Sequence, residues 1–338
     1  MPNVREVFQM STQKIEPELG FVERQHDHRR RRDRNRKIGA FAVVAMLAAA
    51  VSILIVTTRP GANSGPADDA TVAPLPVPPG FTATIVDLAT GSGTPLDGLT
   101  GGAKYAASPD GTQIAFGTCC GIPARISVGN IDGTEEREVA PPIGFDAYGP
   151  YWSPNGTELV YQQRPRFTNQ LGSLIVQDLA TGETTELATL EGKDAWWYLG
   201  PSFSPDGRTV IYQQARVARP GFDVWSVPAS GGEPTKLLED AGFPRYFPDG
   251  ERIVFVAGMR WNLRGERLVI AEPDGSLRTL ATGAQWAAWP AISPDGTRVA
   301  YTDGPSIIVV DVATGASVEV AEGSAAEWVD DGSLIVSP

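Results

Sequence analysis

The sequence has few of the side chains that enzymes most often use for acid–base or metal chemistry. Among its 338 residues there are two histidines, His26 and His28, and both lie in the basic N-terminal region. The rest of the chain, downstream of His28, has none. A Ser-His-Asp triad or an imidazole-based zinc site therefore cannot be built there from this chain alone.

Cysteine is equally scarce. The two cysteines, Cys119 and Cys120, are adjacent, and no C-x-x-C pair exists, so a thiolate zinc site is not supported. They are either small core or loop residues or a strained vicinal disulfide, which an oxidising compartment would permit. The sequence predicts no metal ion and no cofactor.

Charge is distributed unevenly between the two ends of the chain. Residues 1–37 contain ten Lys or Arg against six Asp or Glu, a net charge of +4, whereas residues 38–338 contain eighteen against thirty-four, a net charge of −16. Phosphate would be repelled by the larger, acidic part, so nucleic acid is not expected as a partner.

A long run without charge follows the basic region. Ile38 to Val56 comprises nineteen uncharged residues, which as a helix would reach about 28 Å, close to the hydrocarbon thickness of a bilayer. We expect a transmembrane signal-anchor helix over 38–58. Because the basic cluster precedes it, the N-terminus is expected in the cytoplasm and the C-terminal part outside. A cleaved signal peptide is the alternative, but the charged and apolar regions are both longer than usual.

Two flanking segments are expected to lack a core of their own. The cytoplasmic tail, 1–37, is predicted to be a disordered segment that meets anionic headgroups; a short helix that docks on a partner is the alternative. Residues 59–80 are rich in Pro, Gly and Ala, which is typical of a semi-extended linker.

Two short turn phrases alternate along residues 81–338. The first, Ser-Pro-Asp-Gly at 108–111, returns in the same or a related form at 153, 204, 247, 293 and 329. The second, Asp-Leu-Ala-Thr-Gly at 87–91, returns at 131, 178, 228, 272 and 311. Copies of the first phrase lie 36 to 51 residues apart, and such a period indicates a propeller or a solenoid.

The chemistry of the first phrase is that of a turn. Proline fixes φ, Asp bonds a backbone N–H, and Gly accepts a positive φ. Each phrase precedes a run rich in β-branched and aromatic residues, such as 208–212, as a buried strand requires. Asn155 replaces Asp in one copy, which a general acid or base would not tolerate. Asp206 and its counterparts are therefore predicted to be structural.

The order of the phrases predicts a closed ring. Residues 81–99 contain a second phrase and 325–337 contain a first phrase, so each end supplies half of one unit. We expect an all-β, six-bladed β-propeller in which N-terminal outer strands pair with C-terminal inner strands. Closure of this kind protects the edges of the sheets.

The repeats resemble the WD40-like (PD40) repeats of TolB-type six-bladed propellers over residues 81–338. The resemblance implies the fold and says little about function. TolB itself has an additional α/β domain, whereas this chain is expected to carry a membrane anchor, so we do not expect it to be TolB. Similar propellers cover the active sites of prolyl-oligopeptidase-type peptidases, but this sequence has no G-x-S-x-G motif.

Long basic loops in three consecutive repeats, at 162–172, 213–222 and 257–267, are expected on the face opposite the turn phrases, together with aromatic residues from the loops that lead into the inner strands. Such residues suit an anionic or peptide ligand. The alternative is that the arginines are solvated and some aromatics, Trp152 and Trp225 above all, belong to the core. The candidate ligand-binding residues are Arg164, Arg166, Arg216, Arg219, Arg260, Arg264, Tyr148, Trp196, Trp197, Tyr198, Trp261, Trp286 and Trp289.

Two classes of function fit these features. The first is a membrane-anchored, extracytoplasmic and non-catalytic binding or scaffold module for a protein, peptide or anionic ligand. The second is an enzyme with paired carboxylates, as in propeller glycosidases; Asp146, Asp194 and Glu266 lie in suitable loops, but nothing marks two of them as a pair. The sequence favours the binding module and does not name its ligand or its oligomeric state.

Overall fold

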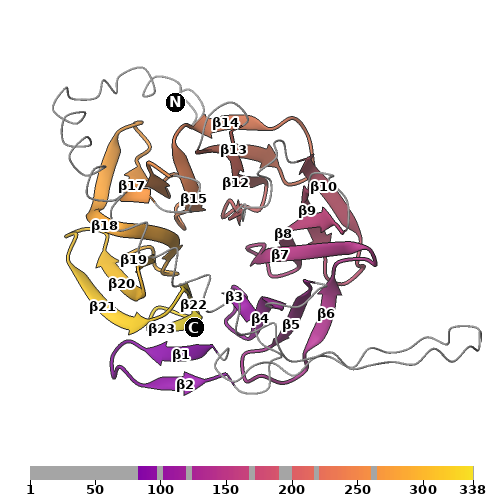
Figure 1. The fold of residues 1–338 in the computed structure, drawn as a ribbon, viewed down its shortest axis with the longest axis horizontal. Helices are drawn as coiled ribbons and strands as arrows, with labels where there is room; N and C mark the ends of the chain where they lie inside the picture. The colour runs from indigo at the N-terminus through magenta and orange to yellow at the C-terminus, as the bar shows by residue number, and fades with distance from the viewer. Residues whose placement is uncertain are drawn as a thin grey trace, which may run out of the picture. The chain divides into compact units, whose positions relative to one another are not determined.

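The fold is a six-bladed β-propeller, as the repeats predict. The computed structural model describes residues 83–96, 102–118, 124–166, 172–189, 200–216, 221–259 and 265–337. These residues form antiparallel sheets arranged in a ring (Figure 1), and the region that the inner strands surround, around the axis of the ring, is called the channel here. The predicted cytoplasmic tail, the membrane helix at 38–58, the linker and the Cys119–Cys120 pair lie outside the described residues. Within the described residues there is no helix long and apolar enough to cross a membrane.

Three blades are regular four-stranded units, each ordered from the channel outward. Blade 1 contains β3 (Gly102–Ala107), β4 (Gln113–Thr118), β5 (Ile126–Asn130) and β6 (Arg137–Ala140). Blade 2 contains β7 (Phe145–Trp152), β8 (Glu158–Pro165), β9 (Ser173–Asp178) and β10 (Thr184–Thr189). Blade 3 contains β11 (Ser202–Phe203), β12 (Thr209–Ala215), β13 (Phe222–Pro228) and β14 (Thr235–Leu238).

Blades 4 and 5 share one long strand, which the sequence did not predict. β18 (Leu277–Ile292) pairs first with β17 of blade 4 and then with β19 of blade 5, so it serves as the outer strand of one and the inner strand of the next. Blade 4 also contains β15 (Ala241–Tyr246), β16 (Ile253–Ala257) and β17 (Gly265–Ala271). Blade 5 also contains β19 (Arg298–Asp303), β20 (Ser306–Asp311) and β21 (Ser317–Glu322).

The sixth blade closes the ring with strands from both ends of the propeller. Its order is β22 (Ala325–Trp328), β23 (Ser333–Ser337), β1 (Thr84–Asp87) and β2 (Gly93–Pro95). Thr84 pairs with Val336 and Asp87 with Ser333, so the predicted pairing of N-terminal outer strands with C-terminal inner strands is confirmed (Figure 1).

The turn phrases adopt the predicted hydrogen-bonded geometry. Ser204 Oγ donates to Asp206 Oδ1 at 2.6 Å and accepts the Thr209 N–H at 3.0 Å. Gly207, at φ 71°, donates its N–H to the Ser204 carbonyl. The hydrogen bond from Ser204 Oγ, followed by that from the Arg208 N–H, lowers the pKa of the Asp206 carboxyl. Asn155 accepts the same bond from Ser153 Oγ, at 2.7 Å, so the turn needs the oxygen rather than the charge.

The core lies between neighbouring blades. The middle strands pack large side chains with no solvent exposure, such as Phe116, Tyr161 and Tyr212, against the next sheet. Trp152 is buried, as predicted, and donates its Nε1–H to the Ala106 carbonyl of the preceding blade at 2.8 Å. Trp225 is only partly buried, at the edge of the same core.

Candidate functional site

The face opposite the turn phrases, called here the loop face, carries five described candidate residues with side-chain positions. They are Tyr148, Arg164, Arg166, Arg216 and Trp289. Trp286 belongs to β18, but its side chain lies outside the described part of the chain. The remaining candidates, Arg219, Arg260, Arg264, Trp196, Trp197, Tyr198 and Trp261, also lie outside it.

Arg164 and Arg166 share one carboxylate at the start of β7. Arg166 Nε lies 2.8 Å from Asp146 Oδ1, and Arg164 Nη2 lies 3.6 Å from Asp146 Oδ2. Asp146 also accepts the Ala124 N–H of the preceding blade at 3.0 Å. Arg164 Nη2 donates to the Tyr148 hydroxyl at 3.3 Å. These cations are thus neutralised within blade 2, and the bond from Ala124 ties Asp146 to blade 1.

Arg216 has a comparable role one blade further on. Its guanidinium contacts Asp223 Oδ1 and Asp240 Oδ1, both at 2.6 Å, and its side chain is largely buried. Asp240 immediately precedes β15, so the ion pairs join blade 3 to blade 4. The described arginines are therefore neither solvated nor free, and they brace the frame of the loop face.

A second group of charged residues lies where the inner strands line the channel. We call Lys104, Tyr151, Arg245, Trp289 and Glu327 the channel cluster; the five residues come from β3, β7, β15, β18 and β22. Lys104 and Arg245 are 4% and 6% exposed, respectively. Ring closure thus brings together side chains of five different blades.

The Lys104 amine is buried between aromatic rings. Its Nζ lies 4.1 Å from the centroid of the Tyr151 ring and 4.3 Å from that of the Trp289 ring, and it has no hydrogen-bond partner among the described residues. Cation–π contacts contribute about 2 kcal/mol when desolvated, less than the several kcal/mol that burying a charge costs. Burial lowers the pKa of Lys104 to about 7, and the charge of Glu327 opposes this shift.

Arg245 is held rigidly beside the same ring. Its Cζ lies 4.0 Å from the Tyr151 ring centroid, and Nη2 donates to the Tyr151 hydroxyl. Nη1 donates to the carbonyls of Gly200 and Pro244, both at 2.9 Å, while Nε has no partner. Burial lowers the pKa of Arg245 to about 10.

Glu327 supplies the negative charge of the cluster. It is half-buried, and burial raises the pKa of its carboxyl while Arg245 and Lys104 lower it. Because the Lys104 amine has no hydrogen-bond partner, Glu327 does not bond it directly. The cluster contains two cations against one carboxylate, with at least two donors unpaired.

Backbone irregularities shape this part of the channel. Phe243 and Trp289 have φ values of 50° and 52° and each precedes a proline; Gly149 and Gly200 occupy the equivalent places with positive φ. A non-glycine residue in this region costs about 1–3 kcal/mol. The Phe243 and Trp289 rings contact each other, with centroids 4.1 Å apart, so the strained positions build an aromatic wall.

The sequence contains a signal for this site that the motif analysis missed. Tyr151, Arg245 and Glu327 all stand two residues before the first residue of a turn phrase, and the equivalent residues elsewhere are Ala106, Ser202 and Ala291. Side chains alternate along a strand, so this position faces the channel in every blade. Charged and aromatic residues in three of its six copies mark a lined channel.

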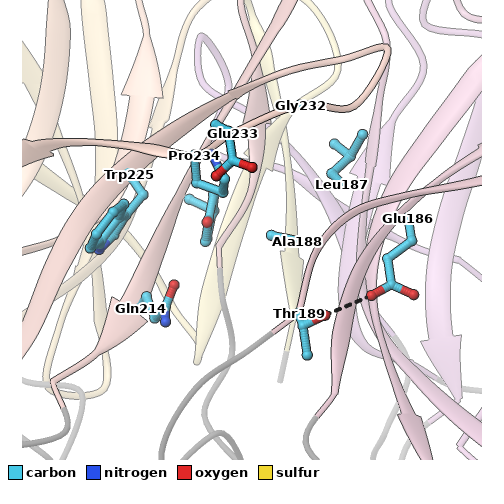
Figure 2. A pocket seen from close by; sticks show the side chains of 10 residues that line it. Glu186, Leu187, Ala188, Thr189, Gln214, Trp225, Gly232, Glu233 and Pro234 are labelled. Carbon is cyan, nitrogen blue, oxygen red and sulfur yellow. Dashed lines mark hydrogen bonds between the residues drawn. The ribbon is translucent and has the colours of Figure 1, made fainter.

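A separate cavity lies between blades 2 and 3, with a volume of about 550 Å³. It opens between β10 and the β13–β14 turn (Figure 2). Trp225 and Leu187 form apolar walls, and Glu186, which accepts a hydrogen bond from Thr189 Oγ1 at 2.9 Å, adds negative charge. No candidate residue of the sequence analysis lies in this cavity.

Known proteins resemble the chain chiefly in fold. No family profile matches it. An uncharacterized protein of Agrobacterium fabrum, Atu1656, is 28% identical over 162 residues, which span 44% of this chain and 52% of that protein. TolB from Acinetobacter baumannii superimposes with a TM-score of 0.53 at 17% identity, over 67% of this chain and 64% of that one.

Two further structures carry the same fold. A TolB-like protein from Agrobacterium tumefaciens has a TM-score of 0.61 at 17% identity, over 76% of this chain and 96% of that one. Hydrazine synthase of Kuenenia stuttgartiensis has a TM-score of 0.52 at 17% identity, over 75% of this chain and 85% of that one. At such identities the likeness concerns the fold alone. The chain is a six-bladed β-propeller whose fold is similar to that of TolB-type proteins.

Proposed function

We propose that this protein is a non-catalytic binding module, held outside the membrane by the helix at Ile38 to Val56, that takes its ligand at the loop face and the adjoining channel. The observation that carries the proposal is the channel cluster. It presents buried donors that lack partners among the described residues, in a frame braced by the Arg216–Asp240 ion pair and by the hydrogen bond from Ala124 to Asp146, each of which joins two blades. A preformed site of this kind suits recognition, because little freedom is lost on binding.

The carboxylates of the loop face support this proposal over a glycosidase. A glycosidase needs two carboxyl groups facing the scissile bond. Asp146 is instead neutralised by Arg166 and Arg164 and bonded to the Ala124 N–H. Glu266 is exposed at the start of β17, and Asp194 lies outside the described residues.

Photocrosslinking in membranes tests the binding face. A photoreactive residue in place of Tyr148, on the loop face, is expected to give a crosslinked product of discrete mass. The same residue in place of Glu183, an exposed position in the β9–β10 turn, serves as the control on the turn face and is expected to give none. Equal crosslinking from both positions would contradict the proposal.

The enzymatic alternative and the orientation each have a direct test. A screen of glycoside and ester substrates with the full chain is expected to show no hydrolysis; a hydrolysis rate abolished by Glu266→Gln would favour the enzyme.

The membrane orientation is tested by labelling. A tag placed after Pro338 is expected to be accessible on intact cells, whereas a tag before Met1 is not. The reverse labelling would place the propeller in the cytoplasm.

A further inference from the structure

The channel cluster has an unbalanced charge that the fold does not explain. Lys104 and Arg245 carry positive charge against the single carboxylate of Glu327. Arg245 has a structural role, since it bonds three backbone carbonyls and Tyr151. Lys104 has no such role in the part of the chain that the structure describes, because its Nζ has no hydrogen-bond partner there although it is almost fully buried. An apolar residue would pack against Tyr151 and Trp289 without the cost of burying a charge.

The position of the amine favours an acceptor that comes from outside the chain. Lys104 Nζ and Arg245 Cζ lie 4.1 Å and 4.0 Å from the same Tyr151 ring centroid, so their separation cannot exceed the sum of those distances. Arg245 Nε is a second buried donor without a partner. An anion that reaches the amine would therefore lie in the field of both cations.

Glu327 restricts the charge of that anion. Its carboxylate lies close enough to Lys104 and Arg245 to influence the pKa of each. A ligand group with two negative charges would face this carboxylate in a poorly solvated channel, where like charges repel strongly. A singly charged group restores balance to two cations and one carboxylate.

We infer that the channel cluster binds a carboxylate group of the ligand, with Lys104 as the principal donor and Glu327 selecting against doubly charged anions. This inference rests on the proposed binding function and names the chemistry that the channel recognises. The carboxylate belongs either to a small organic acid or to the C-terminus of a peptide, and both present the same group to Lys104.

Titration of the purified full-length protein tests the inference. The probes are acetate, N-acetyl-triglycine, the C-terminal amide of that peptide, and inorganic phosphate, each followed by ligand-observed NMR. Saturable binding of acetate or of the peptide acid is expected, with none for the amide and weaker binding for phosphate. Tighter binding of the peptide acid than of acetate indicates a peptide terminus; tighter binding of acetate indicates a small acid.

Two variants assign the binding to the cluster. Lys104→Met is expected to weaken carboxylate binding by about tenfold or more, since it removes a charged hydrogen bond. Glu327→Gln is expected to strengthen it and to admit phosphate, because a repulsive charge is removed. A merely destabilised site would not give changes of opposite sign.

The pH dependence supplies a second readout in the wild-type protein. Lys104, with a pKa near 7, loses its charge as the pH rises, while Arg245, with a pKa of about 10, stays charged. The other charged group that faces the amine is Glu327, and burial raises the pKa of its carboxyl. Carboxylate affinity is therefore expected to fall between about pH 6 and pH 8. Absence of saturable carboxylate binding, or equal binding by the peptide acid and its amide, would overturn the inference. The photocrosslinking experiment at Tyr148 tests the binding face independently, so the proposed function could hold even if the carboxylate inference fails.

Discussion

The turn face and the channel of this propeller satisfy their polar groups in opposite ways. In the turns, Asp206 Oδ1 takes its hydrogen bonds from Ser204 and Arg208, two residues away in either direction. In the channel, Arg245 reaches the Tyr151 hydroxyl, 94 residues away, and Lys104 finds only aromatic ring faces. Local turns close on themselves and need no ligand, whereas the channel depends on ring closure and leaves donors open.

Removing residues 325–338 should have the largest effect, because it should disrupt the channel and leave the local turns unchanged. The truncation deletes β22 and β23, so β1 and β2 lose their partner and the channel loses Glu327. Because closure protects the edges of the ring, cooperative thermal unfolding of the propeller should be lost while the turn sequences remain. A truncated chain that unfolds as sharply and at the same temperature as the parent would contradict a closed ring.

Breaking a long-range ion pair should have the next largest effect. Asp146→Ala leaves Arg166 and the Ala124 N–H without their buried acceptor, and the free energy of unfolding should fall by about 3 kcal/mol in urea titrations. The matched control is Glu138→Ala, which breaks the exposed pair with Arg125 and should cost less than about 1 kcal/mol. Equal losses would mean that Asp146 does not brace the blades.

Lys104→Met should act in the opposite direction and stabilise the protein. Removing a buried amine without a partner should raise the free energy of unfolding at pH 7 by about 1–2 kcal/mol. In the wild type, the folded pKa of Lys104 is about 7 and the ordinary value is 10.5. From pH 7 to 9 the unfolded chain therefore holds a proton that the folded protein does not, and stability should rise with pH.

The advantage of the Lys104→Met variant should accordingly shrink over the same pH range, as measured by urea unfolding at pH 6, 7, 8 and 9. A constant difference between the two proteins would show that the Lys104 amine does not change protonation on unfolding near neutral pH. A less stable variant at every pH would show that the amine has a structural partner.

Asp206→Asn should have the smallest effect. Asn155 already performs the same task in its own turn, so the melting temperature at pH 7 should change by less than about 2 °C. Hydrogen bonds, first that from Ser204, lower the folded pKa of Asp206 below 3.8. Its contribution is therefore present above pH 4 and lost as the pH falls through the folded pKa.

The Asp206→Asn variant should not lose the stability that the ionised Asp206 contributes to the wild type and loses in acid. Its melting temperature near pH 3 should therefore be slightly higher than that of the wild type. Eight other turn aspartates have pKa values lowered in the same direction, which keeps the increment small; they are Asp87, Asp110, Asp132, Asp178, Asp249, Asp274, Asp295 and Asp311. A large loss of stability at pH 7 would mean that the charge of Asp206, not its oxygen, builds the turn.

The contacts that the candidate residues make could not be predicted from the sequence. From their residue type and loop position, Arg166 and Arg216 were predicted to bind a ligand. In the structure both form ion pairs with carboxylates of nearby strands. These carboxylates could not be named from the sequence, because Asp146 comes close to Arg166, and Asp223 to Arg216, only when the strands pair. Trp289 was predicted, but its contact with Lys104 was not.

The sequence by itself determined the propeller, the turns and the closure of the ring. Each turn phrase carries the hydrogen-bonding groups that it needs within a few residues, and the half-units at 81–99 and 325–337 leave one way to complete the last blade. Tertiary structure alone decided that Lys104, Arg245 and Glu327 share one channel and that the Lys104 amine has no hydrogen-bond partner within the described ranges. The physical reason is distance along the chain: turn chemistry acts between near neighbours, whereas the charge balance of the channel is fixed only when six blades have met around it.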